Sequence, residues 1–148
     1  MIAVEQVKDV PAYIRQMYTD NNFMTKFGVH IGEIKCGSAE VSIDVDPAKH
    51  FNHRDILHGG VMLALADSVL GVTGASVGAV VATLNFSMNF IKGVHEPTTL
   101  TVRSHIKHSG HSTMVIEAEM TDSKKNLIGT ILTTMFVVDR FKEIPAKW

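Results

Sequence analysis

The sequence predicts an α+β domain in which one antiparallel sheet packs on a long central helix. Three observations lead to this prediction. The 148 residues suffice for a single domain with a full core. One long apolar helical segment, 60–76, lies near the middle of the chain. Strand patterns fill most of the remainder, two before that helix and four after it, and strands grouped in this way favour an antiparallel sheet.

The part of the chain before the central helix is predicted to contain a short helix and two strands. Pro11 stands at a plausible helix start, and the apolar residues that follow have helical spacing, which indicates a short amphipathic helix within residues 10–22. Residues 27–34 and 39–46 resemble strands joined by a turn. Apolar and polar residues alternate strictly in the second of these, so one face of the sheet contacts water.

Four strand patterns follow the central helix. They cover residues 80–93, 98–108, 112–122 and 127–140. The second and third are expected to form a hairpin that turns at Ser109 and Gly110. There is no internal repeat or Pro-rich linker, so we expect one domain over residues 1–148.

Composition excludes several classes of function. The net charge is −1 without a block of like charge, so no nucleic-acid partner is expected. The single Cys36 excludes an internal disulfide and favours a reducing, cytoplasmic compartment. The uncharged stretch 68–91 contains polar residues and three glycines, and its second half alternates like a strand, so no membrane span is expected. The amino terminus has no apolar run of signal-peptide length.

No metal site is expected. His105, His108 and His111 recur every three residues. In strand and turn geometry this spacing does not place them on one face, and no carboxylate accompanies them in the sequence pattern.

The central helix carries one acid, Asp67, among residues that are apolar nearly all round. Such a helix is expected to be enclosed, and a buried carboxylate without compensation is costly, which makes Asp67 a candidate site residue. The alternative is that Asp67 pairs with an arginine or caps neighbouring backbone. Small residues also form a stripe along the helix at Gly60, Ala64, Asp67 or Ser68, Gly71, and Gly74 or Ala75. Tight packing on the sheet explains the glycines alone, whereas a second subunit or a ligand would also require such a stripe.

The helix begins with His58-Gly59-Gly60. The first backbone N–H groups of a helix have no intrahelical partner, and glycine lets a ligand approach them. Together with the positive end of the helix dipole they can polarise a carbonyl or stabilise an oxyanion. Asp67 follows His58 by nine residues, or about 13–14 Å along a helix, too far for both ends to act on one atom. If both take part, two subunits share each site, so function requires a dimer with antiparallel central helices.

The sequence resembles the hotdog-fold acyl-CoA thioesterases, most closely the PaaI-type branch of phenylacetic acid degradation. The resemblance covers residues 23–139 and is carried by "NHRDILHGGVMLALADSVLG" and the strand "VATLNFSMNFIKG". It implies an antiparallel sheet wrapped around the central helix, and subunits paired as a homodimer or, by doubling, a homotetramer. One departure is Asp55, where the family usually has glycine.

The resemblance also implies roles for individual residues. Asp67 would be the catalytic nucleophile or general base, assisted by the Thr83 hydroxyl. The Gly59 N–H would bind the thioester carbonyl, and His58 and Asn52 would orient the thioester or the attacking water. Asn52, His58 and Gly59 would belong to one subunit, and Asp67 and Thr83 to its partner. The residues predicted to contact CoA are Gly60, His108, Gly110 and His111.

The predicted function is therefore hydrolysis of an aryl- or fatty acyl-CoA to free acid and CoA, with no cofactor beyond the CoA of the substrate. One alternative is a non-catalytic acyl-CoA-binding sensor, against which the presence of Asp67 argues. Another is a CoA-ester hydratase or dehydratase, a chemistry that requires a histidine base in a different loop pattern.

Overall fold

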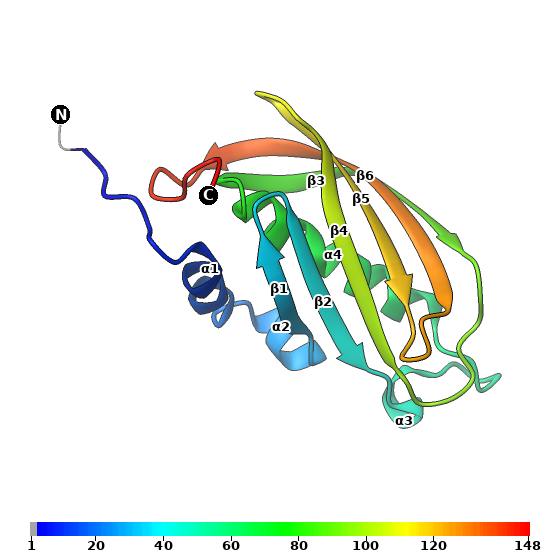
Figure 1. Cartoon of the computed structure of the whole chain (residues 1–148). Helices are drawn as coiled ribbons and strands as arrows, with labels where there is room; N and C mark the ends of the chain where they lie inside the picture. The colour runs from blue at the N-terminus through cyan, green and yellow to red at the C-terminus, as the bar shows by residue number, and fades with distance from the viewer. Residues whose placement is uncertain (1–2) are drawn as a thin grey trace.

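A six-stranded antiparallel sheet curves around helix α4 (Gly59–Ala75) in the computed structural model, which describes residues 3–148 (Figure 1). The strands are β1 (His30–Lys35), β2 (Ser38–Asp44), β3 (Ala79–Phe90), β4 (Thr99–Ser109), β5 (Thr113–Thr121) and β6 (Leu127–Arg140). Their order in the sheet is β1-β2-β4-β5-β6-β3, and each neighbouring pair is antiparallel. The predicted α+β class is confirmed, and the strands β1 and β3 form the two edges.

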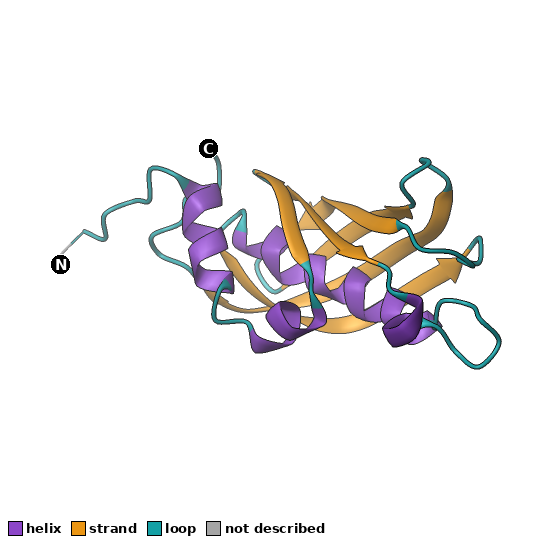
Figure 2. Ribbon diagram, turned by 90° about the horizontal axis from the view of Figure 1, so that it is seen from below, coloured by secondary structure: helices purple, strands orange, loops and turns teal. Residues whose placement is uncertain are grey.

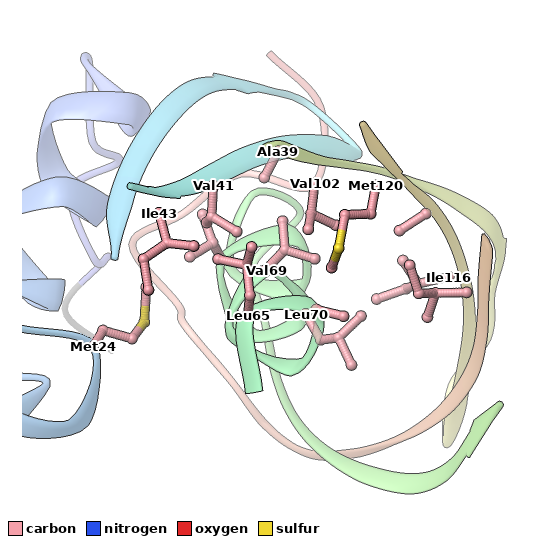
Figure 3. Packing of buried hydrophobic residues seen from close by; sticks show 14 of the residues in the cluster. Met24, Ala39, Val41, Ile43, Leu65, Val69, Leu70, Val102, Ile116 and Met120 are labelled. Carbon is pink, nitrogen blue, oxygen red and sulfur yellow. The ribbon is translucent and has the colours of Figure 1, made fainter. Parts of the chain in front are cut away.

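The core lies between α4 and the concave face of the sheet (Figure 3). From α4, Leu65, Val69 and Leu70 point towards the strands and are almost completely buried. The strands contribute the alternate residues that face the helix, including Val41 and Met120. Full burial of one such side chain stabilises the fold by about 1.5–3 kcal/mol, so this seam holds α4 against the sheet.

The opposite side of α4 is exposed, and the prediction of an enclosed helix is wrong for the single chain. Gly60, Leu63 and Asp67 are exposed, and Ala64 and Ser68 are half-buried. The sheet of one chain covers only the side of the helix that faces it (Figure 2). An apolar pattern predicts that a helix face is buried, but it does not predict whether the same chain or a second molecule covers that face.

The short amphipathic helix predicted within residues 10–22 forms, but it ends before residue 22, and a second helix follows it. Helix α1 (Val10–Tyr18) ends at Thr19, and α2 (Asn22–Phe27) begins after Asn21, whose side chain accepts a 3.0 Å hydrogen bond from the Met24 N–H. This cap restarts the helix in a new direction. Gly28 then adopts a left-handed φ of 80°, which ends α2, and the first strand begins at His30.

Two further segments frame the central helix. The short helix α3 (Pro47–His50) precedes the loop that leads into α4. At the other end, the Trp148 indole N–H donates a 2.7 Å hydrogen bond to the Ser76 carbonyl just after α4. The described residues include no helix with the length and apolar character that a bilayer crossing requires.

Candidate active site

The carboxylate of Asp67 meets a hydroxyl from the neighbouring edge strand. Thr83, on β3, donates a hydrogen bond of 3.0 Å from Oγ1 to Oδ1 of Asp67, on α4. The register of β3 against β6 shifts between Thr83 and Asn85, so the strand is irregular at this point. Among the partners found within residues 3–148, the Asp67 carboxylate has no ion pair and no other hydrogen bond, so neither an arginine nor a backbone cap explains it.

Asp67 is exposed in the single chain, contrary to the expectation of burial. Its side chain leaves the exposed side of α4, where Gly60 and Ala64 of the small-residue stripe also lie. Because the sheet does not cover this side, the carboxylate is available to a ligand or to a second molecule. The candidate role of Asp67 therefore depends on this accessibility rather than on the cost of burying a charge.

A cavity of about 500 Å³ opens beside Asp67. Asp67, Thr83 and Ser68 supply polar groups to its wall. The remaining wall is mainly apolar and comes from three parts of the chain: α4, the strands β3 and β6, and the two amino-terminal helices. These residues are Tyr18, Asn21, Phe23, Met24, Ala64, Leu70, Gly71, Val81 and Met135. An apolar cavity with a carboxylate on its wall suits an acyl group whose reactive end meets the acid.

The glycines of the small-residue stripe have two different neighbours. A Cβ at Gly74 would lie 2.8 Å from Val81 Cγ2, so that glycine permits tight packing of α4 on β3. A Cβ at Gly71 would instead collide with the Tyr18 hydroxyl, and Gly71 lines the cavity. Packing on the sheet thus explains Gly74, whereas Gly71 belongs to the candidate site.

The loop before α4 is organised by Asn52. The Asn52 Oδ1 accepts hydrogen bonds from the N–H groups of Arg54, at 2.9 Å, and Ile56, at 3.3 Å. Asp55 adopts the left-handed region with φ of 57°, so this aspartate takes the conformation that glycine adopts without strain. Asn52 therefore shapes the loop through its carbonyl oxygen, which leaves only its side-chain N–H₂ for a ligand.

His58 is the N-cap residue of α4, and one nitrogen of its exposed ring binds the helix backbone. The His58 Nδ1 accepts a 2.8 Å hydrogen bond from the Gly60 N–H, so that amide already has an acceptor within the chain. The Gly59 N–H has no acceptor among the described residues. Phe90, at the end of β3, lies beside Gly59, 3.5 Å from where a Cβ would be. The free amide at the helix start is therefore that of Gly59.

Gly59 and Asp67 do not meet within one chain. Eight residues separate them on α4, which is about 12 Å along the helix axis. Within one chain, the Asp67–Thr83 pair with its cavity therefore lies apart from the Gly59 amide and the loop through Asn52 and His58.

The β4–β5 hairpin lies far from the start of α4 in the same chain. Its first β5 residue pairs with Phe136, which pairs in turn with Ala82, whereas Gly59 lies next to Phe90 at the far end of β3. Seven or eight residues of strand correspond to roughly 25 Å. One chain thus separates His108, Gly110 and His111 from Gly60, so any shared CoA site would need two chains.

One basic and one acidic side chain near this hairpin were not predicted from the sequence. The Arg140 guanidinium donates hydrogen bonds to the carbonyls of Gly110, at 3.2 Å, and His111, at 3.5 Å. Glu117 lies 3.3 Å from His105 Nε2, so the expectation that no carboxylate accompanies these histidines is wrong. No local pattern links these partners, because β5 and β6 bring them to β4 only in the folded sheet. The structure, over residues 3–148, groups no three side chains of the kinds that bind metals.

Comparison with known proteins identifies the family. Residues 55–128, half of the chain, match the model of the thioesterase superfamily. The acyl-coenzyme A thioesterase PaaI of Escherichia coli is 24% identical over 112 residues, which cover 76% of this chain and 79% of that protein. The matched region contains the start of α4, Asp67 and Thr83.

Solved structures share the fold. The PaaI protein from the phenylacetic acid degradation operon of E. coli superposes with a TM-score of 0.83 at 20% identity, covering 91% of this chain and 96% of that chain. A hypothetical thioesterase protein with coenzyme A from Streptococcus pneumoniae TIGR4 has a TM-score of 0.73 at 25% identity, covering 79% and 98%. The chain belongs to the thioesterase superfamily, and it is a thioester hydrolase with the hotdog fold of PaaI-type enzymes.

Proposed function

We propose that this protein hydrolyses an acyl-CoA to a free acid and CoA, with Asp67 as the catalytic carboxylate. The observation that carries the proposal is the Asp67–Thr83 hydrogen bond on the wall of an apolar cavity of about 500 Å³. The names of two relatives, an acyl-coenzyme A thioesterase and a thioesterase protein with coenzyme A, support CoA as the thiol part of the substrate.

Hydrolysis requires a carboxylate and a backbone amide to act on the same thioester carbonyl. Either Asp67 attacks the carbonyl carbon, or it takes a proton from a water that attacks; both routes form a C–O bond and move charge to the carbonyl oxygen. The Gly59 N–H at the positive end of α4 stabilises that oxyanion. Collapse breaks the C–S bond, and CoA leaves as the thiolate. If Asp67 attacked directly, water then cleaves the resulting anhydride and releases the acid.

The two halves of the site come together if two chains pair with their α4 helices antiparallel. Three observations support this homodimer. The exposed side of α4 bears Leu63 beside small residues, and β3 is an edge strand with an unpaired side. The exposed apolar residues Leu84 and Phe90 lie on β3, and Ile91 follows it directly. An exposed edge strand and an apolar patch both favour association. In the dimer, each active site combines two sets of residues. One chain provides Asn52, His58 and Gly59, and the other provides Asp67 and Thr83.

A homotetramer is the next step of the same proposal. The outer face of β6 exposes Leu132, Phe136 and Val138 at alternate positions, an apolar row away from α4. Such a row supports a second interface. Cys36 is a free thiol, which suits a reducing compartment, so we place the enzyme in the cytoplasm. The proposed reaction requires no cofactor besides the CoA of the substrate.

The test is release of free thiol from a panel of acyl-CoA thioesters. We expect turnover by the wild type and a loss of at least ~10²-fold in Asp67→Asn, the scale of a positioned acid–base group. The matched control is Asp44→Asn, because Asp44 also accepts a hydrogen bond from a threonine, Thr99, at 2.7 Å, on another part of the sheet. Equal rates in Asp67→Asn and wild type would refute the role of Asp67. No release from any thioester, with retained CoA binding, would favour the sensor, and addition of water to an enoyl-CoA would favour the hydratase.

A further inference from the structure

Tyr18, the last residue of α1, stands between two hollows of the molecule. On one side is the cavity beside Asp67. On the other is a hollow of about 290 Å³ between α1 and β1, lined by Arg15, Thr19, Val29, His30 and Ile31 as well as by Tyr18. Tyr18 is the one residue that the linings of these two hollows share. Its side chain is therefore the partition between them.

The partition is closed by a contact with α4. The Tyr18 hydroxyl occupies the space that a side chain at Gly71 would take, and the ring carbon Cζ lies 3.6 Å from the position of that Cβ. Gly71 follows Asp67 by four residues, about one turn or 6 Å along the helix axis. The distance from the Asp67 carboxylate to the Tyr18–Gly71 contact is therefore about the length of a short aliphatic chain or of one aromatic ring.

The hollow behind Tyr18 could continue the cavity if the ring were absent. Val29 and Ile31 give it half-buried apolar surface. The Arg15 guanidinium, its one cationic group besides the histidine, is held on the carbonyls of Ile31 and Gly32. An acyl chain that passed Tyr18 would therefore enter an open hollow in which Val29 and Ile31 offer apolar contact.

We propose that Tyr18 determines acyl-chain length in this enzyme, closing the acyl cavity against Gly71 so that chains longer than the cavity are rejected. This inference rests on the proposed function, because it takes the cavity beside Asp67 as the acyl site. It names the substrate class more narrowly: short aliphatic or single-ring acyl groups. Tyr18 acts on specificity and takes no part in bond making or breaking.

The experiment compares kcat/KM for acetyl-, hexanoyl-, decanoyl- and palmitoyl-CoA in the wild type and in Tyr18→Ala. We expect the wild type to favour hexanoyl- over decanoyl-CoA, and Tyr18→Ala to raise the decanoyl-to-hexanoyl ratio by about tenfold or more, since even one methylene in an apolar pocket changes specificity by roughly tenfold or more. Tyr18→Phe keeps the ring and should keep the wild-type ratio.

Tyr13→Ala is the control for a lost tyrosine on the same helix. Tyr13 is exposed, and its hydroxyl donates a 2.7 Å hydrogen bond to Glu143 away from the cavity, so activity and chain-length profile should stay unchanged. Tyr18→Leu, shorter but still apolar, replaces Tyr18→Ala if the larger deletion unfolds the protein. An unchanged ratio in folded Tyr18→Ala or Tyr18→Leu would overturn the inference. A wild type that releases no thiol from any thioester would instead overturn the proposed function.

Discussion

The hydroxyl of Thr83 and the carboxylate of Asp67 form a 3.0 Å hydrogen bond that joins the edge strand β3 to the central helix α4. Because the hydroxyl engages only Oδ1, the second carboxylate oxygen, Oδ2, stays free to face a substrate. The bond holds the carboxylate in one orientation at the wall of the cavity of about 500 Å³. A short side chain on a strand thus positions an acid that a helix alone would leave free to rotate.

Removal of this hydroxyl should slow hydrolysis without unfolding the protein. For Thr83→Val we expect kcat/KM to fall by about tenfold, since a hydrogen bond to a charged group contributes on the order of 1.5 kcal/mol. Thr83→Ser should recover most of the loss. The control is Thr99→Val, which removes the equivalent donor from Asp44. Wild-type kinetics in Thr83→Val would show that the contact is not used in catalysis.

The Gly59 amide can be removed while the helix is kept. Proline is well tolerated at the first position of a helix, and His58 has the extended conformation, φ −64° and ψ 130°, that a residue before proline prefers. Gly59→Pro should therefore keep α4 and lose roughly 10²–10³-fold in kcat, the usual effect of deleting an oxyanion donor. Gly59→Ala retains the N–H, places its Cβ 3.5 Å from Phe90, and should stay within about tenfold of the wild type.

Mixing two inactive variants tests whether a site is shared between chains. In a mixed dimer of Asp67→Asn and Gly59→Pro chains, one site combines both defects and the other has neither. We expect thiol release to rise, after unfolding and joint refolding of equal amounts, to about a quarter of the wild-type rate. Either variant refolded alone provides the baseline. A mixture that stays at that baseline would mean that each chain carries its own complete site.

Alkaline pH should weaken the fold through Tyr18. Burial raises the pKa of Tyr18 to about 12, against about 10 in an unfolded chain. Below pH 10 both states keep the proton and stability is unaffected; as the pH rises from 10 to 12, only the unfolded chain ionises, so stability falls by about 2–3 kcal/mol. Urea unfolding at several pH values measures this loss.

Tyr18→Phe should flatten that pH dependence. The hydrogen bond to Glu143 raises the pKa of Tyr13, the second tyrosine of the chain, in the same direction, so Tyr13 accounts for any slope that remains. Phenolate absorbance should accordingly appear above pH 10 in the folded wild type. A midpoint near 10 for both tyrosines would contradict the burial of Tyr18.

The contact between Tyr18 and Gly71 predicts a coupled pair of substitutions. Gly71→Ala should destabilise the protein by about 1–2 kcal/mol, because its methyl group collides with the Tyr18 hydroxyl. In the Tyr18→Phe background the same methyl lies 3.6 Å from the ring, an ordinary contact, and the cost should vanish. Gly74→Ala, which meets Val81 instead, should gain nothing from Tyr18→Phe. If the changes in the free energy of unfolding caused by Gly71→Ala and Tyr18→Phe simply add, in thermal or urea unfolding, the contact is contradicted.

Local patterns predicted the parts of this molecule that follow from periodicity. The strand 127–140 matches β6 at both ends, and the central helix 60–76 differs from α4 by one residue at each end. Its apolar sequence, its single acid Asp67 and the glycines at its start identified both halves of the candidate site. These features are local because hydrogen bonding and side-chain alternation within an element repeat every few residues.

Where the prediction failed, the structure was decided by residues outside the pattern on which the prediction was based. The helix predicted within residues 10–22 is shorter than that range, because α1 ends at Tyr18 and the Asn21 cap begins α2. The charge on Asp67 was expected to be buried because its neighbours on α4 are apolar, yet the sheet covers only the other side of the helix.

The sequence by itself determined the α+β class, the apolar central helix, and an acid and a free amide about 12 Å apart on that helix. Only the tertiary structure decided that Thr83 reaches Asp67, that Tyr18 lies on Gly71, and which side of α4 is left uncovered. The physical reason is that periodicity is a property of one segment, whereas a contact between distant residues depends on how several segments pack at once. Amino-acid spacing records which faces are apolar but not what covers them.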